Sequence, residues 1–200
     1  MATKRLIIIS LPPPELFLEI KKVQEKISFK TGAREAVLYP PHITLRTGAL
    51  IPEGEIGRYI RGLEAHLANR EPFQVKVKAL EFFEYLHKDA PAFFTGFTLE
   101  KEGCLAAFHD YLWDYDLYAK SVRKNYEPHL SLAYKDLLKE DFLNLRDNLK
   151  SELPEILNPP FFWVLDNLWL YHFTGEKWEA YWGMTLGSST GRAGAGCFYT

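Results

Sequence analysis

Apolar residues recur along this chain with two periods, one typical of helices and one typical of strands. A spacing of three to four residues predicts helices over about 12–31, 52–69, 102–118 and 138–153. Apolar or alternating runs predict strands over 4–10, 36–39, 42–50, 73–85, 92–99, 129–134, 161–172 and 177–186. Turn residues at 88–91 and 174–176 predict that the strands on either side of each turn pair antiparallel.

This order of elements predicts an α+β fold. Helices with one apolar face and strands with alternating faces suit antiparallel sheets that carry helices on their outer faces. The other faces of the sheets are then open to line a central cleft. We expect one bilobal, pseudo-twofold domain over 1–186, made of two intertwined lobes. Residues 187–200 are rich in Gly, Ser and Thr, and we expect them to form a flexible tail.

Two short segments in opposite halves of the chain match each other. Residues 41–45 read PHITL and residues 128–132 read PHLSL, each inside a predicted strand. Side chains alternate between the faces of a strand, so His42 and Thr44 point one way while Ile43 and Leu45 point the other. The second segment behaves alike, and the same order of elements follows each one. We interpret this as an internal duplication with one histidine motif in each lobe.

Paired imidazoles and hydroxyls suit acid–base chemistry on a phosphate ester. An imidazole titrates near pH ~6.5, so its acidic and basic forms coexist near neutrality. One neutral histidine can take a proton from water while the other, protonated, donates to the leaving oxygen, each role giving ~10²–10⁴-fold in rate. The hydroxyls of Thr44 and Ser131 can donate to the phosphate oxygens, where charge accumulates. This chemistry needs no metal and no cofactor, and the remaining histidines and the two cysteines show no metal-ligand spacing.

The two His-x-Thr/Ser motifs resemble those of the two-histidine (2H) phosphoesterase superfamily. This superfamily includes the 2′–5′ RNA ligase-like proteins and the cyclic phosphodiesterases, and the fit extends over roughly residues 4–186. The resemblance implies a bilobal α+β fold and hydrolysis of 2′,3′-cyclic phosphates on nucleotides or RNA ends, usually leaving a 2′-phosphate. It also implies that His42 and His129 form the acid–base pair, with Thr44 and Ser131 as phosphate donors. The motifs are symmetrical, so which histidine is the acid stays open.

Further side chains are candidates for substrate binding. Arg46 lies two residues beyond Thr44 and is expected to share the open face, where it can hold a phosphate or stand as an exposed structural arginine. Tyr126 is the preferred residue for stacking a nucleobase, because it lies in the loop that enters the second motif. Core packing is the default for the other aromatic candidates, Tyr134, Trp169 and Tyr171, and Tyr134 falls on the apolar face. A basic stretch precedes the second motif at Lys120, Arg123 and Lys124.

Composition narrows the class of partner. A net charge of −2 argues against a protein that coats double-stranded nucleic acid, which needs many phosphate contacts. No apolar run approaches transmembrane length, so we expect no membrane association. Two cysteines without a disulfide framework favour a reducing, cytoplasmic location. We expect a monomer whose partner is a nucleotide or RNA-end cyclic phosphate.

Two alternatives remain beside this hypothesis. The same site can act on another phosphodiester, such as an ADP-ribose cyclic phosphate or a 2′–5′ linkage. The chain can also be a non-catalytic module that binds RNA ends or nucleotides. The presence of both histidines argues against the second alternative, because loss of one would spare binding and abolish catalysis.

Overall fold

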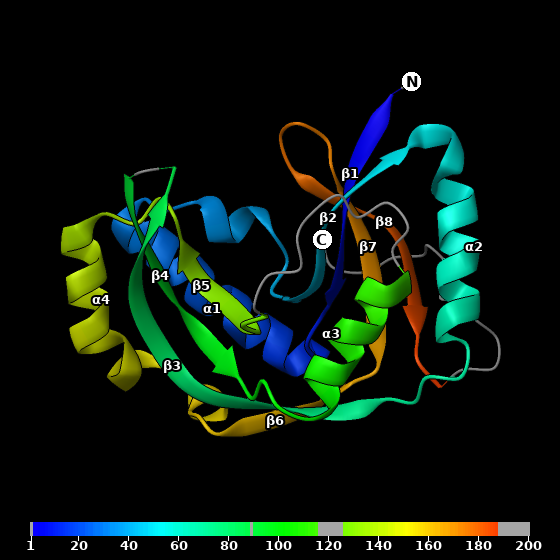
Figure 1. The fold of residues 1–200 in the computed structure, drawn as a ribbon. Helices are drawn as coiled ribbons and strands as arrows, with labels where there is room; N and C mark the ends of the chain where they lie inside the picture. The colour runs from blue at the N-terminus through cyan, green and yellow to red at the C-terminus, as the bar shows by residue number, and fades with distance from the viewer. Residues whose placement is uncertain (1, 89, 116–125, 188–200) are drawn as a thin grey trace.

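The computed structural model describes residues 2–88, 90–115 and 126–187, and shows two four-stranded antiparallel sheets (Figure 1). The first sheet has the order β2 (Ile43–Pro52), β1 (Thr3–Ser10), β7 (Asn167–Phe173), β8 (Trp178–Thr185). The second has the order β5 (His129–Tyr134), β4 (Ala90–Leu99), β3 (Phe73–His87), β6 (Phe161–Leu165). The predicted α+β class with antiparallel sheets is therefore confirmed.

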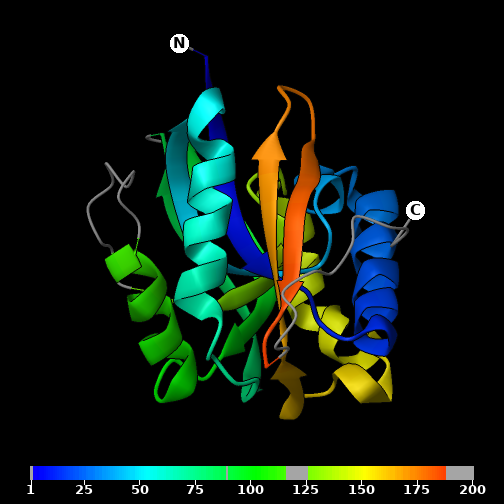
Figure 2. The same cartoon turned by 90° about the vertical axis from the view of Figure 1, so that its right-hand side faces the viewer.

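Helices pack on one face of each sheet. They are α1 (Pro14–Thr31), α2 (Ile56–Leu67), α3 (Cys104–Tyr115) and α4 (Lys139–Glu152), with short 3₁₀ turns η1 (Glu35–Leu38), η2 (Glu53–Glu55) and η3 (Glu155–Leu157). Helix α4 lies on β3 and β4, and α1 lies on β5. Figure 2 shows α2 and α3 next to each other on the side of the first sheet. None of the described helices is long and apolar enough to cross a membrane.

The predicted apolar faces form the core. Helix α1 buries Leu16, Ile20, Val23 and Ile27, and it ends where Gly32 adopts a left-handed φ of 76°. There the Gly32 amide donates to the carbonyl of Ser28, as a helix C-cap requires. The apolar residues of the two motif strands, Ile43, Leu45, Leu130 and Leu132, are at most 1% exposed. Both motif strands are therefore anchored from their core side.

The two halves of the chain exchange a strand. Each half runs strand, helix, motif strand, helix, strand, as β1-α1-β2-α2-β3 and then β4-α3-β5-α4 followed by β6 and β7. Strand β3 of the first half is third in the second sheet, and β7 of the second half is third in the first sheet. The motif strands β2 and β5 are thus the edge strands of their sheets, and they contact each other.

One predicted strand is absent and another is divided. Residues 36–38 of the predicted strand over 36–39 belong to η1, because the side chain of Asp136 accepts hydrogen bonds from the amides of Arg34 and Glu35 and holds a helical turn there. Residues 161–172 form two strands in different sheets. The chain changes sheet at Asp166, whose carbonyl binds the amide of Leu186, while the side chain of Asn167 holds the backbone of Leu11.

Parts of the sequence prediction lie outside the described residues. These are the tail from residue 188 onward and the basic stretch with Lys120, Arg123 and Lys124. The end of the predicted helix over 102–118 also lies there, beyond Tyr115.

Candidate active site

The two motif histidines are held by equivalent backbone contacts. His42 directly precedes β2 and His129 begins β5. Nδ1 of His42 lies 2.7 Å from the carbonyl oxygen of Pro40, and Nδ1 of His129 lies 2.9 Å from that of Glu127. A carbonyl only accepts, so each Nδ1 carries the proton that it donates. In both residues this leaves Nε2 as the nitrogen available for proton transfer.

The motif hydroxyls lie on the same strand faces as the histidines. The hydroxyl of Thr44 lies 3.1 Å from Nε2 of His42, and with Nδ1 protonated it donates to that nitrogen in the neutral ring. Ser131 lies two residues beyond His129 and, like Thr44, is partly buried. The structure thus gives each motif one imidazole and one hydroxyl on the side of the strand away from the core.

Burial and the second imidazole both lower the pKa of His42. Burial chiefly, with a smaller contribution from the positive charge of His129, lowers its pKa from 6.5 to about 4, against the raising effect of the Pro40 carbonyl. The strands that follow His42 and begin at His129, β2 and β5, contact each other. His42 is therefore a neutral base at neutral pH.

Each motif strand carries a bulge immediately after its hydroxyl residue. In β2 the residues paired with Ile9 and Ile8 are Thr44 and Arg46, so Leu45 is an extra residue. In β5 the residues paired with Gly96 and Thr95 are Ser131 and Ala133, so Leu132 is extra. A bulge reverses the alternation of faces for the residues that follow it. The duplication therefore extends to an irregularity that the sequence pattern does not reveal.

The bulge corrects the expected placement of Arg46. Its side chain is 1% exposed and turns to the core side with Ile8, not to the open face with Thr44. There the guanidinium carbon lies 3.1 Å from the ring centroid of Trp113 on α3, and one nitrogen donates to the carbonyl of Thr47. The idea of an exposed structural arginine is wrong as well, while its contact with substrate stays a prediction.

The bulge in β5 corrects Tyr134 in the opposite sense. Tyr134 pairs with Phe94 instead of following Leu130 and Leu132 into the core. Its ring is partly buried and stacks on Tyr85 of β3, with ring centroids 5.9 Å apart. Tyr134 therefore leaves the apolar face on which alternation had placed it.

Tyr126 lies against the first motif. Its hydroxyl donates to the backbone carbonyl of Thr44 at 3.1 Å, and its ring stacks on the imidazole of His109 at 3.8 Å between centroids. Burial raises the pKa of its phenol. One ring face and the hydroxyl thus contact the protein itself, and the stacking of a base on Tyr126 stays a prediction.

Sequence reasoning missed several neighbours of the histidines. The ring of Tyr39 lies 5.9 Å from His42, and that of Phe94 meets His129 edge-on at 5.1 Å. Gln24 of α1 is 3% exposed and donates to the carbonyl of Ser131 at 2.9 Å. The signal for Gln24 was available, because a glutamine between Val23 and Ile27 interrupts the apolar face of that helix.

Other aromatic candidates pack against the first sheet. Trp169 and Tyr171 are partly buried against a small cluster around Ile7 and Ile9, as the core-packing default had it. The indole of Trp169 lies directly over Gly183, where an added Cβ would meet its ring at 2.6 Å. These rings share the face of Ile9, which pairs with Thr44, and so lie on the side of the first sheet that carries the motif.

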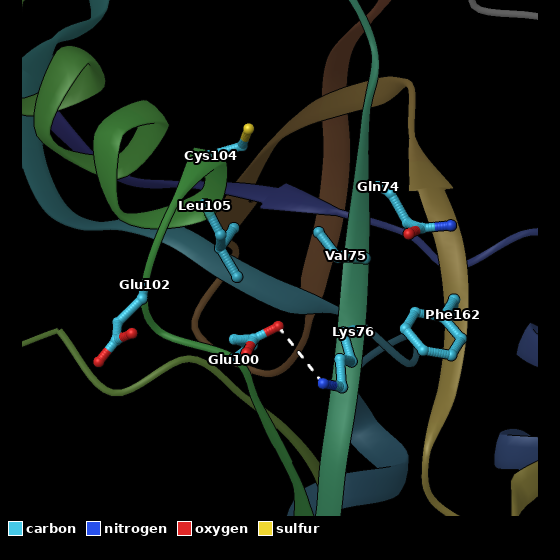
Figure 3. A pocket seen from close by; sticks show the side chains of 8 residues that line it. All are labelled: Gln74, Val75, Lys76, Glu100, Glu102, Cys104, Leu105 and Phe162. Carbon is cyan, nitrogen blue, oxygen red and sulfur yellow. Dashed lines mark ion pairs between the residues drawn. The ribbon is translucent and has the colours of Figure 1, made fainter.

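A separate pocket of about 210 Å³ lies away from both histidines (Figure 3). Its lining comes from the start of β3, the end of β4, the start of α3 and β6, and includes Lys76, Glu100, Cys104 and Phe162. The ammonium of Lys76 lies 3.7 Å from the carboxylate of Glu100 across it. Among the described residues, no cluster of His, Cys, Asp and Glu has the geometry of a metal site.

The comparison with protein families agrees with this geometry. The sequence profile of the 2′-5′ RNA ligase superfamily matches residues 12–177, a span that contains both histidine motifs. The chain belongs to this superfamily. It is therefore a member of the 2H phosphoesterases, as the two motifs predicted. No curated protein matches the chain at a significant level.

Solved structures share the fold at low sequence identity. TT0787 of Thermus thermophilus matches with a TM-score of 0.62 and 16% identity, over 91% of this chain and 97% of that one. A protein described as a phosphoesterase matches with a TM-score of 0.57 and 14% identity, over 94% and 100%. Escherichia coli LigT in complex with NADP+ matches with a TM-score of 0.54 and 15% identity, over 94% and 100%. These similarities establish the common fold.

Proposed function

We propose that this 2H phosphoesterase hydrolyses 2′,3′-cyclic phosphates on nucleotides or RNA ends without a metal and releases a 2′-phosphate. The observation that carries the proposal is the pair of imidazoles on contacting edge strands, each anchored through Nδ1 with Nε2 left for proton transfer. A reaction that needs one base and one acid on opposite sides of a phosphorus uses such a pair directly.

The difference between the two histidines supports an assignment of roles. A pKa of about 4 keeps His42 neutral near neutral pH, so it acts as the base that takes the proton from water. His129 is then the acid that protonates the leaving 3′-oxygen. Water attacks phosphorus, the bond to the 3′-oxygen breaks, and the 2′-ester remains.

The hydroxyls of Thr44 and Ser131 bind the non-bridging oxygens of the phosphate. They lie on the same strand faces as the histidines. A bulge follows each hydroxyl residue, so the residues beyond it no longer continue the alternation that places histidine and hydroxyl on this face. Hydrogen bonds at these oxygens stabilise the transition state more than the ground state, because negative charge accumulates there. Arg46 and Tyr126 were predicted from the sequence as substrate contacts. Arg46 would act from the core side of β2, and Tyr126 from its contact with the carbonyl of Thr44.

Nucleotide ligands of a structural relative agree with this substrate class. Escherichia coli LigT, matched with TM-scores of 0.54 and 0.52 in two structures, is in complex with NADP+ in one and with 3′-AMP in the other. A phosphate on a ribose hydroxyl is common to both molecules. In NADP+ that phosphate is on the 2′-oxygen, as in the product that we propose here, whereas in 3′-AMP it is on the 3′-oxygen.

The deciding experiment is turnover of 2′,3′-cyclic AMP in EDTA, with 2′- and 3′-AMP resolved by chromatography. We expect release of 2′-AMP, and a loss of at least ~10²-fold in turnover for both His42→Ala and His129→Ala. His87→Ala is the matched control, because His87 lies at the far end of β3 and should leave turnover unchanged.

Two results would contradict the proposal. One is near-wild-type turnover by either motif variant. The other is no turnover of cyclic mononucleotides or of RNA ending in a cyclic phosphate, and turnover of ADP-ribose cyclic phosphate or of 2′–5′ linkages would then support the alternative phosphodiester substrates. Binding of 2′-AMP without any turnover would then support the non-catalytic module.

A further inference from the structure

The carbonyl oxygens of the two motif hydroxyl residues are each held by a side chain from the other half of the chain. Gln24 on α1, in the first half, donates to the carbonyl of Ser131 at 2.9 Å. Tyr126, in the second half, donates to the carbonyl of Thr44 at 3.1 Å. The two accepting carbonyls occupy equivalent positions in the two motifs, although a glutamine on a helix donates to one and a tyrosine before a strand donates to the other.

These contacts occur on strands that lie at the edges of their sheets. Strands β2 and β5 are edge strands, with a neighbouring strand in their sheet on one side only. A bulge follows each hydroxyl residue directly, which weakens the ladder at that position. Each motif strand is thus held by backbone pairing on one side only, and a side chain that holds its backbone from elsewhere in the fold adds a second attachment.

We infer that Gln24 and Tyr126 are positioning residues that fix the catalytic hydroxyls by holding the backbone carbonyls of Ser131 and Thr44. Neither residue needs to touch substrate. Each acts through the residue whose carbonyl it holds. Tyr126 acts through Thr44, whose hydroxyl lies 3.1 Å from Nε2 of His42, and Gln24 acts through Ser131.

The surroundings of the two donors fit this role. Gln24 is 3% exposed, and a buried polar side chain on an apolar helix face needs a specific hydrogen bond to offset its desolvation. Tyr126 is fixed by its stack on His109, whose ring is held in turn because its Nε2 accepts from Nε1 of Trp113 at 2.8 Å. Trp113 also carries the guanidinium of Arg46, two residues beyond Thr44. A closed set of contacts thus connects Tyr126 to both sides of the bulge in β2.

The test uses the near-isosteric variants Tyr126→Phe and Gln24→Met, which remove each donor. We expect kcat for 2′,3′-cyclic AMP to fall about tenfold in each while KM stays within about twofold, because small misplacement of a transition-state donor affects the chemical step. Tyr111→Phe is the matched control, since its hydroxyl donates to the carbonyl of His66 at 2.6 Å, between α2 and α3. Gln74→Met controls for the glutamine change on the exposed surface of β3.

A double-mutant cycle separates positioning from a general structural role. Tyr126→Phe should add nothing to Thr44→Val and should add its full effect to Ser131→Ala, with the reverse pattern for Gln24→Met. Unchanged kcat, an equal loss in the Tyr111→Phe control, or effects that add in every background would overturn the inference.

The inference rests on the proposed reaction, so it also needs a measurement that does not use turnover. The ¹³C carbonyl shift of Thr44 should change in Tyr126→Phe and that of Ser131 in Gln24→Met, with a lower methyl order parameter for Thr44 in the first variant. An inactive wild type would contradict the proposed function alone. Unchanged shifts and order parameters would contradict the positioning role, whatever the activity.

Discussion

Nε2 of His42 lies 3.1 Å from the hydroxyl oxygen of Thr44, two residues further along the chain. Since Nδ1 of His42 donates to the Pro40 carbonyl, the hydroxyl of Thr44 is the donor in this hydrogen bond. In the site without substrate, the base and the phosphate-binding hydroxyl are therefore hydrogen-bonded to each other. A phosphate that takes the hydroxyl leaves Nε2 ready to accept a proton from water.

Thr44→Val should separate these functions, because valine keeps the shape and the core contacts of the strand. We expect kcat to fall by about 10²-fold through loss of one transition-state donor. The free energy of unfolding, measured in urea, should stay within about 1 kcal/mol. Thr47→Val, at an exposed position of the same strand, is the control and should change neither quantity. A Thr44→Val enzyme with wild-type kcat would remove Thr44 from the mechanism.

The lowered pKa of His42 predicts how stability depends on pH. The unfolded chain binds a proton on His42 at pH 6.5, whereas the folded protein does so only near pH 4. Between these values the unfolded state binds more protons, so the free energy of unfolding falls as the pH is lowered from about 6.5 to about 4. The contribution lost is about 3 kcal/mol.

Urea unfolding of wild type and His42→Gln across this pH range measures that contribution. The variant cannot take up the proton, and its stability should depend less steeply on pH within the window. Parallel stability curves for the two proteins would show that His42 titrates normally in the folded state.

The same pKa predicts the acidic side of the rate profile. Catalysis needs His42 unprotonated, so kcat/KM should rise with pH around pH 4 and should already be near its plateau at pH 5. A histidine with its ordinary pKa would place this rise near pH ~6.5. A rise of kcat/KM centred near pH 6.5 would mean that another group, or a more exposed His42, controls the base.

Removal of the second imidazole should raise the pKa of His42, because the positive charge of His129 is one cause of its lowering. An NMR titration of His42 in His129→Ala measures this shift without any turnover. His66→Ala, where α2 packs against Tyr111 of α3, is the control and should leave the His42 titration unchanged. Equal pKa values in wild type and His129→Ala would place the imidazoles too far apart to share one phosphorus.

Gly96→Ala should disturb the second motif through the backbone. Gly96 pairs with Ser131, and an added Cβ would clash with the carbonyl oxygen of Leu130 and lie 2.6 Å from the ring of Phe94. Strand β5 must then move away from β4, and we expect a loss of about 1–3 kcal/mol in stability together with reduced kcat. Gly54→Ala, where an added Cβ meets nothing within 4 Å, should be neutral. Wild-type activity in Gly96→Ala would show that the site tolerates such a shift.

The periodicity of apolar residues predicted most helices and strands, because each of these elements buries one apolar face in the core. Apolar spacing alone predicted the buried helix faces that contain Ile20 and Leu145. It also predicted the strand over 129–134. The errors occur where something other than periodicity acts. Asp136 turns 35–38 into a 3₁₀ helix, and the change of sheet at Asp166 depends on contacts with residues far away in sequence.

The sequence predicted the two histidine motifs of the candidate site, but not the contacts that hold their strands. A strict alternation placed Arg46 beside Thr44, and only the pairing with Ile8 and Ile9 reveals the extra residue that turns it inward. Gln24 and Tyr126 contact backbone atoms more than 80 residues away in sequence, at separations of 107 and 82. Backbone carbonyls are the same in every residue type, so no sequence pattern marks the ones that are held.

The exchange of β3 and β7 between the sheets bears on how such a molecule originates. Each half of the chain completes the sheet of the other, so neither half keeps a full sheet when it is separated. Two copies of a single ancestral half, swapping their third strands across a twofold axis, would already bring two histidine motifs together. Gene fusion would then leave the halves free to diverge, and Thr44 in one motif against Ser131 in the other is a difference of that kind.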